Sequence, residues 1–197
     1  MGYDAIVLAS ASARRSRLLD QIGVRHRIAA ADIDETPRDG ERPADYVSRL
    51  AAAKAKAVVA AATGLGDVPV LAADTTVVLG TRIFGKPEGE AGCIEMLTAL
   101  AGRTHEVLTA VALWHDGRLS GATSLSRVAF RAIAADECRR YWATGEPAGK
   151  AGGYAIQGLG AVFVERLEGS FTGVMGLPLF ETAALLDAAG VRRWQSP

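Results

Sequence analysis

The chain has 197 residues, of which 49% are apolar and 22% charged, an ordinary balance for one globular domain that buries its own core. Its 22 basic and 22 acidic residues cancel, so it lacks the broad positive field with which duplex-binding proteins displace counterions. We therefore expect no nucleic-acid partner. Any polyanion that the chain binds should be small and held by a local group of cations.

No segment is typical of a membrane helix or an export signal. No run approaches the roughly 20 apolar residues that span a bilayer, and the alanine-rich stretch Leu50–Ala62 is interrupted by Lys54 and Lys56. The N-terminus has no basic region followed by a long apolar stretch, as a signal peptide has. The two cysteines, Cys93 and Cys138, are far apart and predict reduced thiols. These features predict a cytoplasmic protein without a membrane partner.

The first half of the chain alternates apolar runs with helical segments and polar turns. The predicted elements are, in chain order, a strand at Ala5–Ala9, a helix at Ala13–Gln21 ended by Gly23, a strand at Arg25–Ala31, an acidic turn at Asp32–Gly40, a helix from Pro43 to about Ala62, a strand at Val68–Ala73 ending in Asp74, and a hairpin at Val77–Phe84 around Gly80-Thr81.

The second half continues the same mixture. It predicts a helix at Pro87–Leu100, a strand at Val107–Trp114, a turn at His115–Gly117, a strand at Leu125–Ile133, a helix capped by Asp136 and ended by Gly145, an irregular glycine-rich segment at Lys150–Gly160, a strand at Ala161–Leu167 and a last helix at Pro178–Ala188. Interleaved strands and helices predict an α/β fold in a single domain that spans residues 1–197.

The segment Ser10–Arg17 places arginines where a helix should begin. A helix N-terminus carries about half a positive charge, so Arg14 and Arg15 are mildly unfavourable there unless an anion is bound. Hydroxyls, backbone N–H groups and guanidiniums together suit a phosphate. A solvated arginine face explains the segment equally well.

Two acidic positions suggest a divalent cation. Asp74 is expected at the carboxyl end of an apolar strand, where open α/β sheets place their ligands, and Glu35 lies in the acidic turn. Their oxygens, with phosphates and water, would suit Mg²⁺ or Mn²⁺. The alternatives are a salt bridge to an arginine for Asp74 and an ordinary acidic loop for Glu35.

Three further side chains suit a nucleotide. Lys54 and Lys56 do not share one helical face, so at most one should point inward. Lys86 lies in the fixed turn Gly85-Lys86-Pro87, which is not a P-loop. The glycines around Gln157 allow close backbone approach to a ligand, and its amide could read a base edge. Taken alone, each lysine is better explained as a solvated surface charge. The three histidines, His26, His105 and His115, lack metal-ligand spacing and are interpreted as structural or solvated.

Together these blocks resemble the Maf family. The resemblance rests, in order along nearly the whole chain, on Leu8–Arg15, Asp34–Pro37, Val47–Ala51 with Lys54-Ala55, Ala73–Thr75, Gly85–Pro87, Gly102–His105, Thr144–Pro147 through Gln157-Gly158, and Gly176–Leu179. Two positions depart from the family pattern: Ala13 replaces a usual proline, and Gly149 replaces a usual aspartate.

The resemblance implies a mixed sheet with flanking helices, similar to the inosine-triphosphate pyrophosphatases, with two lobes around a central cleft and often a homodimer. It implies a metal-dependent pyrophosphatase that cuts nucleoside triphosphates to the monophosphate and pyrophosphate. Within the family, the segments Lys150–Gly152 and Ile156–Gly158, which include Gln157, resemble those of the branch that acts on dTTP and UTP. The sister branch, which acts on 7-methylguanosine triphosphate, usually has a glutamate in place of Gln157.

The resemblance also implies roles for individual residues. Asp74 would accept the proton and, with Glu35, hold the metal. Substrate would be bound by Ser10, Arg14, Arg15, Lys54, Thr75, Lys86 and Gln157, of which Arg14, Thr75 and Gln157 would set base preference. Two alternatives stay open: a 7-methylguanosine triphosphate pyrophosphatase, and a non-catalytic nucleotide-binding regulator of cell division.

Overall fold

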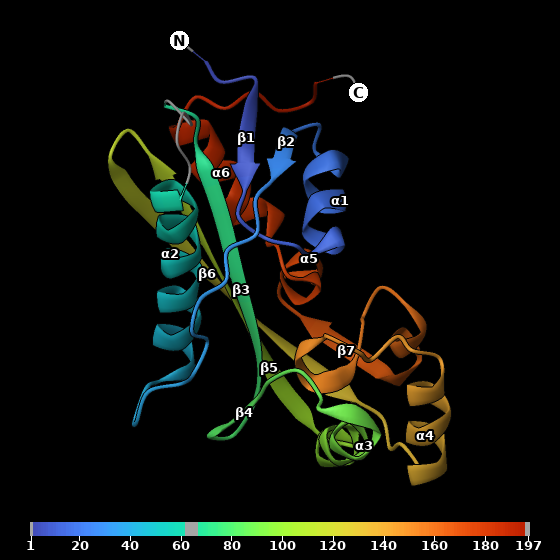
Figure 1. Cartoon of the computed structure of the whole chain (residues 1–197). Coiled ribbons are helices and arrows are strands. Elements are labelled where there is room, and N and C mark those ends of the chain that lie inside the picture. Colours follow the sequence, from blue (N-terminus) through green and yellow to red (C-terminus); the bar gives the residue numbers. More distant parts are fainter. Residues whose placement is uncertain (1, 62–66, 196–197) are drawn as a thin grey trace. The chain divides into compact units, whose positions relative to one another are not determined.

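A computed structural model describes residues 2–61 and 67–195 and shows a mixed α/β fold (Figure 1). Its seven-stranded sheet has the order β2-β1-β3-β5-β6-β7, with β4 paired to β3. The strands are β1 Ala5–Leu8, β2 Arg25–Ile28, β3 Val70–Leu79, β4 Arg82–Phe84, β5 Thr104–His115, β6 Arg118–Phe130 and β7 Val164–Glu168. The helices are α1 Ala13–Gln21, α2 Pro43–Ala61, α3 Gly89–Leu100, α4 Ala135–Ala143, α5 Phe171–Met175 and α6 Leu179–Ala188, with the short 3-10 turns η1 Ala151–Gly153 and η2 Leu159–Phe163.

The predicted mixed sheet with flanking helices is therefore confirmed. Within it the chain forms two compact units. The first contains residues 1–74, 109–124 and 176–197, and the second contains residues 75–108 and 125–175. Each unit has its own buried core, so each can be described from its own residues.

The first unit is built on parallel strand pairs. β1 lies parallel to both β2 and β3, with α1 and α2 in the connections. The run Ile6-Val7-Leu8 is fully buried, as is usual for a parallel strand covered on both faces. Ala55 and Val58 of α2 pack on the strands through small side chains of β1 and β3. Alanine on this helix face lets α2 lie close to the sheet.

The second unit has an aromatic core. Phe130 packs edge-on against His105 and Tyr154, and Phe163 packs edge-on against Tyr141. α3 contacts α4 and η1. Cys93 on α3 and Cys138 on α4 both lie in this core, where they are buried and free. The expectation of reduced, buried thiols is confirmed.

His105 is a buried base in this core and should make folding sensitive to acid. Only 1% of its surface is exposed, its Nε2 lies 2.9 Å from the Tyr154 hydroxyl, and burial lowers its pKa to about 4. Because the unfolded chain protonates near pH 6.5, stability should be complete above that pH and fall by about 3 kcal/mol as the pH drops to about 4. Denaturant unfolding between pH 7 and pH 4 measures this slope. A His105→Asn variant should lose it, and an unchanged slope in that variant would contradict the assignment.

The structure corrects several predicted boundaries. The strand expected to end at Asp74 continues through it to Leu79, because the β-branched Thr75 and Thr76 carry the extended backbone into the predicted hairpin. Asp74 is thus an internal strand residue and not a terminal one. Asp136 lies in the first turn of α4, whose N-cap residue is Ala134. β6 begins at Arg118 instead of Leu125.

Smaller differences concern the strand ends and one unpredicted helix. β2 ends at Ile28, β5 begins at Thr104, and β7 begins at Val164 because the residues before it form the 3-10 turn η2. The short helix α5 was not predicted. Ala62, the expected end of the long helix, lies outside the described residues. None of the helices in the described ranges combines the length and apolar character needed to cross a bilayer.

Candidate functional site

A buried carboxylate marks the candidate site in the first unit. Asp74 follows four fully buried residues of β3, Val70–Ala73, and is itself only 7% exposed. An ionised group in such a place needs a partner, because burying a charge unpaired is costly. Lys54 Nζ supplies it, 2.6 Å from Asp74 Oδ1.

Lys54 holds a second carboxylate at the same time. Its Nζ also lies 2.6 Å from Glu35 Oε1, so one ammonium bridges two acids. Lys54 stands four residues after Leu50 on α2, one turn along the buried stripe, whereas Lys56 is exposed. The prediction that at most one of these lysines points inward is confirmed. The sequence left open a salt bridge from Asp74 to an arginine, and Asp74 is instead paired with Lys54.

The loop that carries Glu35 is fastened from α2. The hydroxyl of Tyr46 donates to the Glu35 carbonyl at 2.9 Å, and Arg49 Nη2 donates to the Thr36 carbonyl at 3.1 Å. Arg49 is held in turn by both oxygens of Glu41, at 2.6 and 2.7 Å. The backbone carbonyls of Glu35 and of the next residue, Thr36, are therefore both held by side-chain donors from α2.

The part that Tyr46 plays in this arrangement is not predicted from the sequence, and Arg49 enters there only as a member of the motif Val47–Ala51. A signal was present, because Tyr46, Leu50 and Lys54 are spaced four residues apart. That spacing places all three on one stripe of the helix.

The electrostatics of the carboxylate reflect its burial. Burial raises the pKa of Asp74 above its ordinary value, and the nearby charges of Lys54 and Arg15 only partly offset this effect. For Arg15, burial lowers the pKa of the guanidinium, while Asp74 and Glu35 act in the opposite direction. The three predicted residues Glu35, Lys54 and Asp74 are thus one cluster, and Arg15 lies within its field.

The serine and arginine motif forms the start of α1. Ser12 is the N-cap residue, and the first turn contains no acid. Arg15 donates from Nη1 to Ser10 Oγ at 3.0 Å and from Nε to the Gly176 carbonyl at 2.8 Å. Arg14 adds a second positive charge that is felt by Arg15. The guanidinium of Arg15 is thereby fixed before any ligand binds.

The remaining predicted residues belong to the second unit. Thr75 is half-buried in β3, and Gln157 is exposed. Lys86 follows β4 in a loop whose Gly85 carbonyl accepts the Gly152 N–H at 3.0 Å. Lys150 donates to the carbonyl of Glu146. The glycine-rich segment is thus bonded to the Lys86 loop, and the predicted irregular backbone of 150–160 is confirmed.

Glu35 and Asp74 could bind a hard cation only together with further ligands such as water and substrate phosphates. Residues 2–61 and 67–195 contain no group of three His, Cys, Asp or Glu side chains placed to hold a metal alone. Both carboxylates contact one Nζ at 2.6 Å, so their oxygens are no further apart than twice that distance. Mg²⁺ commonly uses one or two carboxylates and completes its shell with water and substrate phosphates. The donor set therefore fits such an ion.

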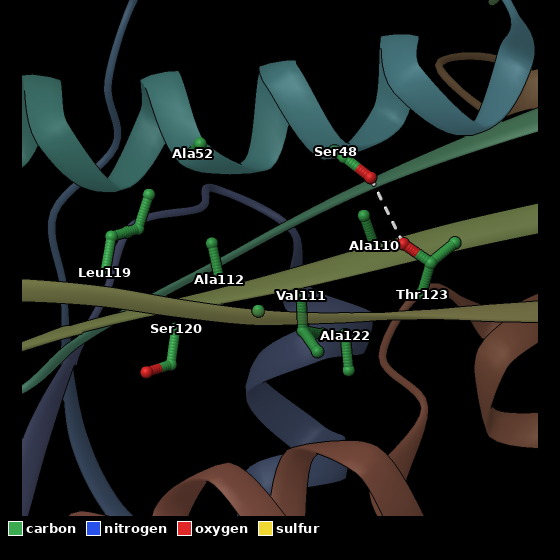
Figure 2. Close-up of a pocket in the computed structure, with 10 residues that line it drawn as sticks. Ser48, Ala52, Ala110, Val111, Ala112, Leu119, Ser120, Ala122 and Thr123 are labelled. Atoms are coloured by element: carbon green, nitrogen blue, oxygen red, sulfur yellow. Dashed lines mark hydrogen bonds between the residues drawn. The ribbon is translucent and has the colours of Figure 1, made fainter.

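A separate hollow of about 380 Å³ lies between α2 and the β5–β6 hairpin (Figure 2). Its lining is small and uncharged: Ser48, Ala52, Ala110, Val111, Ala112, Leu119, Ser120, Gly121, Ala122 and Thr123. Ser48 Oγ and Thr123 Oγ1 are 3.1 Å apart. A triphosphate needs cations, so this hollow is not the candidate site.

The family model for Maf-like proteins matches residues 5–189. The chain belongs to the Maf family. It is 50% identical to a protein of Cupriavidus pinatubonensis named dTTP/UTP pyrophosphatase, over 96% of this chain and 99% of that protein. Proteins of the same name from Saccharophagus degradans and Bordetella parapertussis are 50% and 51% identical, over 97% and 94% of this chain and 91% and 93% of theirs.

One solved structure, the Ham1 protein of Staphylococcus aureus, aligns with 93% of this Maf chain and 96% of its own at 14% identity and a TM-score of 0.47. The chain is placed in the Maf family by the sequence matches and not by this structural alignment. The sequence matches confirm the resemblance seen in the ordered motifs.

Proposed function

We propose that this Maf protein is a metal-dependent pyrophosphatase that hydrolyses dTTP and UTP between the α- and β-phosphates. The observation that carries the proposal is the cluster in which Lys54 bridges Glu35 and Asp74. Acids beside a triphosphate site are unfavourable unless a cation is shared between them and the phosphates. The proposal is further supported by relatives near 50% identity, over almost their full length, that are named dTTP/UTP pyrophosphatases.

Each charged residue has a role in this reaction. Glu35 and Asp74 would hold Mg²⁺ or Mn²⁺, which when bound makes water far more acidic. Asp74 accepts the proton of the attacking water. Lys54, released from the acids, moves its charge to the phosphates. Together with Arg14 and Arg15, it stabilises the negative charge that develops on the leaving pyrophosphate.

Lys86 is assigned to the phosphates and Gln157 to the base. An amide offers one acceptor and one donor side by side, which matches the N3–H and O4 of uracil or thymine. Ser10 and Thr75 complete the proposed substrate contacts. Base preference is assigned to Arg14, Thr75 and Gln157.

The proposal predicts pyrophosphate release from dTTP and UTP in Mg²⁺ or Mn²⁺ and none in EDTA. The test is a panel of dTTP, UTP, CTP, GTP and 7-methylguanosine triphosphate, with pyrophosphate and orthophosphate measured separately. Orthophosphate would mean that a different bond is cut. Preference for 7-methylguanosine triphosphate would favour the sister branch. Tight nucleotide binding without release would favour the non-catalytic regulator.

A further inference from the structure

The carboxylate of Glu146 is a hydrogen-bond centre in the second unit, remote in sequence from the segment that it holds. Its Oε1 accepts the Leu159 N–H at 2.8 Å, and its Oε2 accepts the Gly160 N–H at 2.9 Å. The Tyr141 hydroxyl donates to Oε2 at 2.6 Å and accepts the Ala155 N–H at 3.1 Å. Burial opposes ionisation of Glu146, but these donors and Lys150 outweigh it and lower its pKa. The group is therefore an anion bound by three donors.

These bonds fasten the loop on both sides of Gln157. Ala155 is attached before it, and Leu159 and Gly160 after it, all to the Tyr141–Glu146 pair. The packing is close: a Cβ at Gly158 would lie 2.0 Å from Glu146 Oε1, and one at Gly160 would lie 2.6 Å from the Tyr141 hydroxyl. Both glycines are thus required for the pair to reach the backbone.

Gln157 is the exposed member of an otherwise anchored loop. Ala155, Ile156 and Gly160 are buried, whereas Gln157 faces outward. Exposed loop residues usually have a mobile backbone. Here the core sets the backbone position of Gln157. Tyr141, which is bonded to Ala155 in the loop, packs edge-on against Phe163 of the core. With the backbone anchored, only the side-chain torsions of Gln157 are left to be ordered when it meets a ligand.

Hydrogen-bond pattern alone does not let an amide choose a pyrimidine. Uracil presents N3–H and O4, and guanine presents N1–H and O6, so a glutamine side chain can pair with either edge. The two edges differ in reach, since that of guanine lies further from the sugar by the width of the imidazole ring. Selection between them depends on where the amide is held.

We propose that the Tyr141–Glu146 pair is the positioning element that makes this protein select pyrimidine over purine nucleotides, by holding the backbone from which the side chain of Gln157 meets the base. The inference rests on the proposed function for the role of Gln157 as the base-reading residue. Tyr141 and Glu146 are positioning residues, since they act on the ligand only through the loop.

The test uses Tyr141→Phe, which keeps the ring in the core and removes both hydroxyl bonds. Dissociation constants are measured by calorimetry for the non-hydrolysable α,β-imido analogues of UTP and GTP. The preference for the UTP analogue should fall about tenfold, the effect of roughly one lost hydrogen bond. In a Gln157→Ala background the same substitution should change the preference no further. Amide hydrogen exchange at Ala155, Leu159 and Gly160 should speed up.

Tyr154→Phe is the matched control, because it removes a buried hydroxyl of the same core whose partner is His105. It should leave the preference unchanged. The inference is overturned if Tyr141→Phe weakens the binding of both analogues equally. It is also overturned if Tyr141→Phe lowers the preference as much in the Gln157→Ala background as in the wild type. Wild-type protein that binds neither analogue would contradict the proposed function itself, a result distinct from normal binding with an unchanged preference.

Discussion

Replacing Asp74 with asparagine should lower kcat for dTTP and UTP by about 10³-fold, because it removes the proton acceptor and one of two proposed metal ligands. Steady-state pyrophosphate release at saturating Mg²⁺ measures the loss. The matched control is Asp45→Asn, which makes the same change on α2, where the carboxylate is exposed and paired with Arg42. Turnover of Asp74→Asn within a few fold of wild type would rule out the mechanism.

The same substitution should not destabilise the fold. Burial raises the pKa of Asp74 more than Lys54 and Arg15 lower it. A carboxyl whose folded pKa is raised binds its proton more tightly when folded, so stability is greatest below the ordinary pKa and declines as the pH rises through the folded value. Asparagine is neutral throughout. In metal-free buffer at pH 7 the variant should therefore melt no lower than wild type, and the difference should shrink in acid.

Replacing Lys54 with methionine should lower kcat/KM by about 10²-fold, the size expected for losing one preorganised charge opposite the phosphates. The ligand-free protein should also lose thermal stability, because Glu35 and Asp74 would then face each other without a shared cation. Activity assays and thermal melts in EDTA measure the two effects.

Lys56→Met is the control, since it removes the same charge two residues later from the exposed side of α2. It should change kcat/KM and the melting temperature little. Equal losses in the two variants would show that general charge, and not the bridge, is responsible.

The contrast between these lysines shows what periodicity can predict. Helical spacing alone separates Lys54 from Lys56, and alternation of strands and helices predicts the α/β class. The order of motifs along the chain predicts the family. Each of these signals can be recognised in the sequence alone, either within one segment or by adding up motifs along the chain. They therefore need no knowledge of tertiary contacts.

The missed features depend on contacts between residues far apart in sequence. The strand through Asp74 was ended too early because a charged residue was interpreted as a boundary, whereas Lys54, twenty positions earlier, neutralises it inside the strand. The Tyr46 bond to the loop of Glu35 and the Glu146 bonds to 159–160 join separate segments in the same way. The homodimer, the cytoplasmic location and the metal itself stay predictions.

The attachment of the Gln157 loop has a consequence for how new substrate ranges can arise. Gly158 and Gly160 leave no room for a side chain while Tyr141 and Glu146 are in place. A single replacement at any of these four positions loosens the anchor without building another one. Substitutions made one at a time should therefore give less selective proteins, and libraries aimed at a new preference for purine substrates should randomise all four positions together.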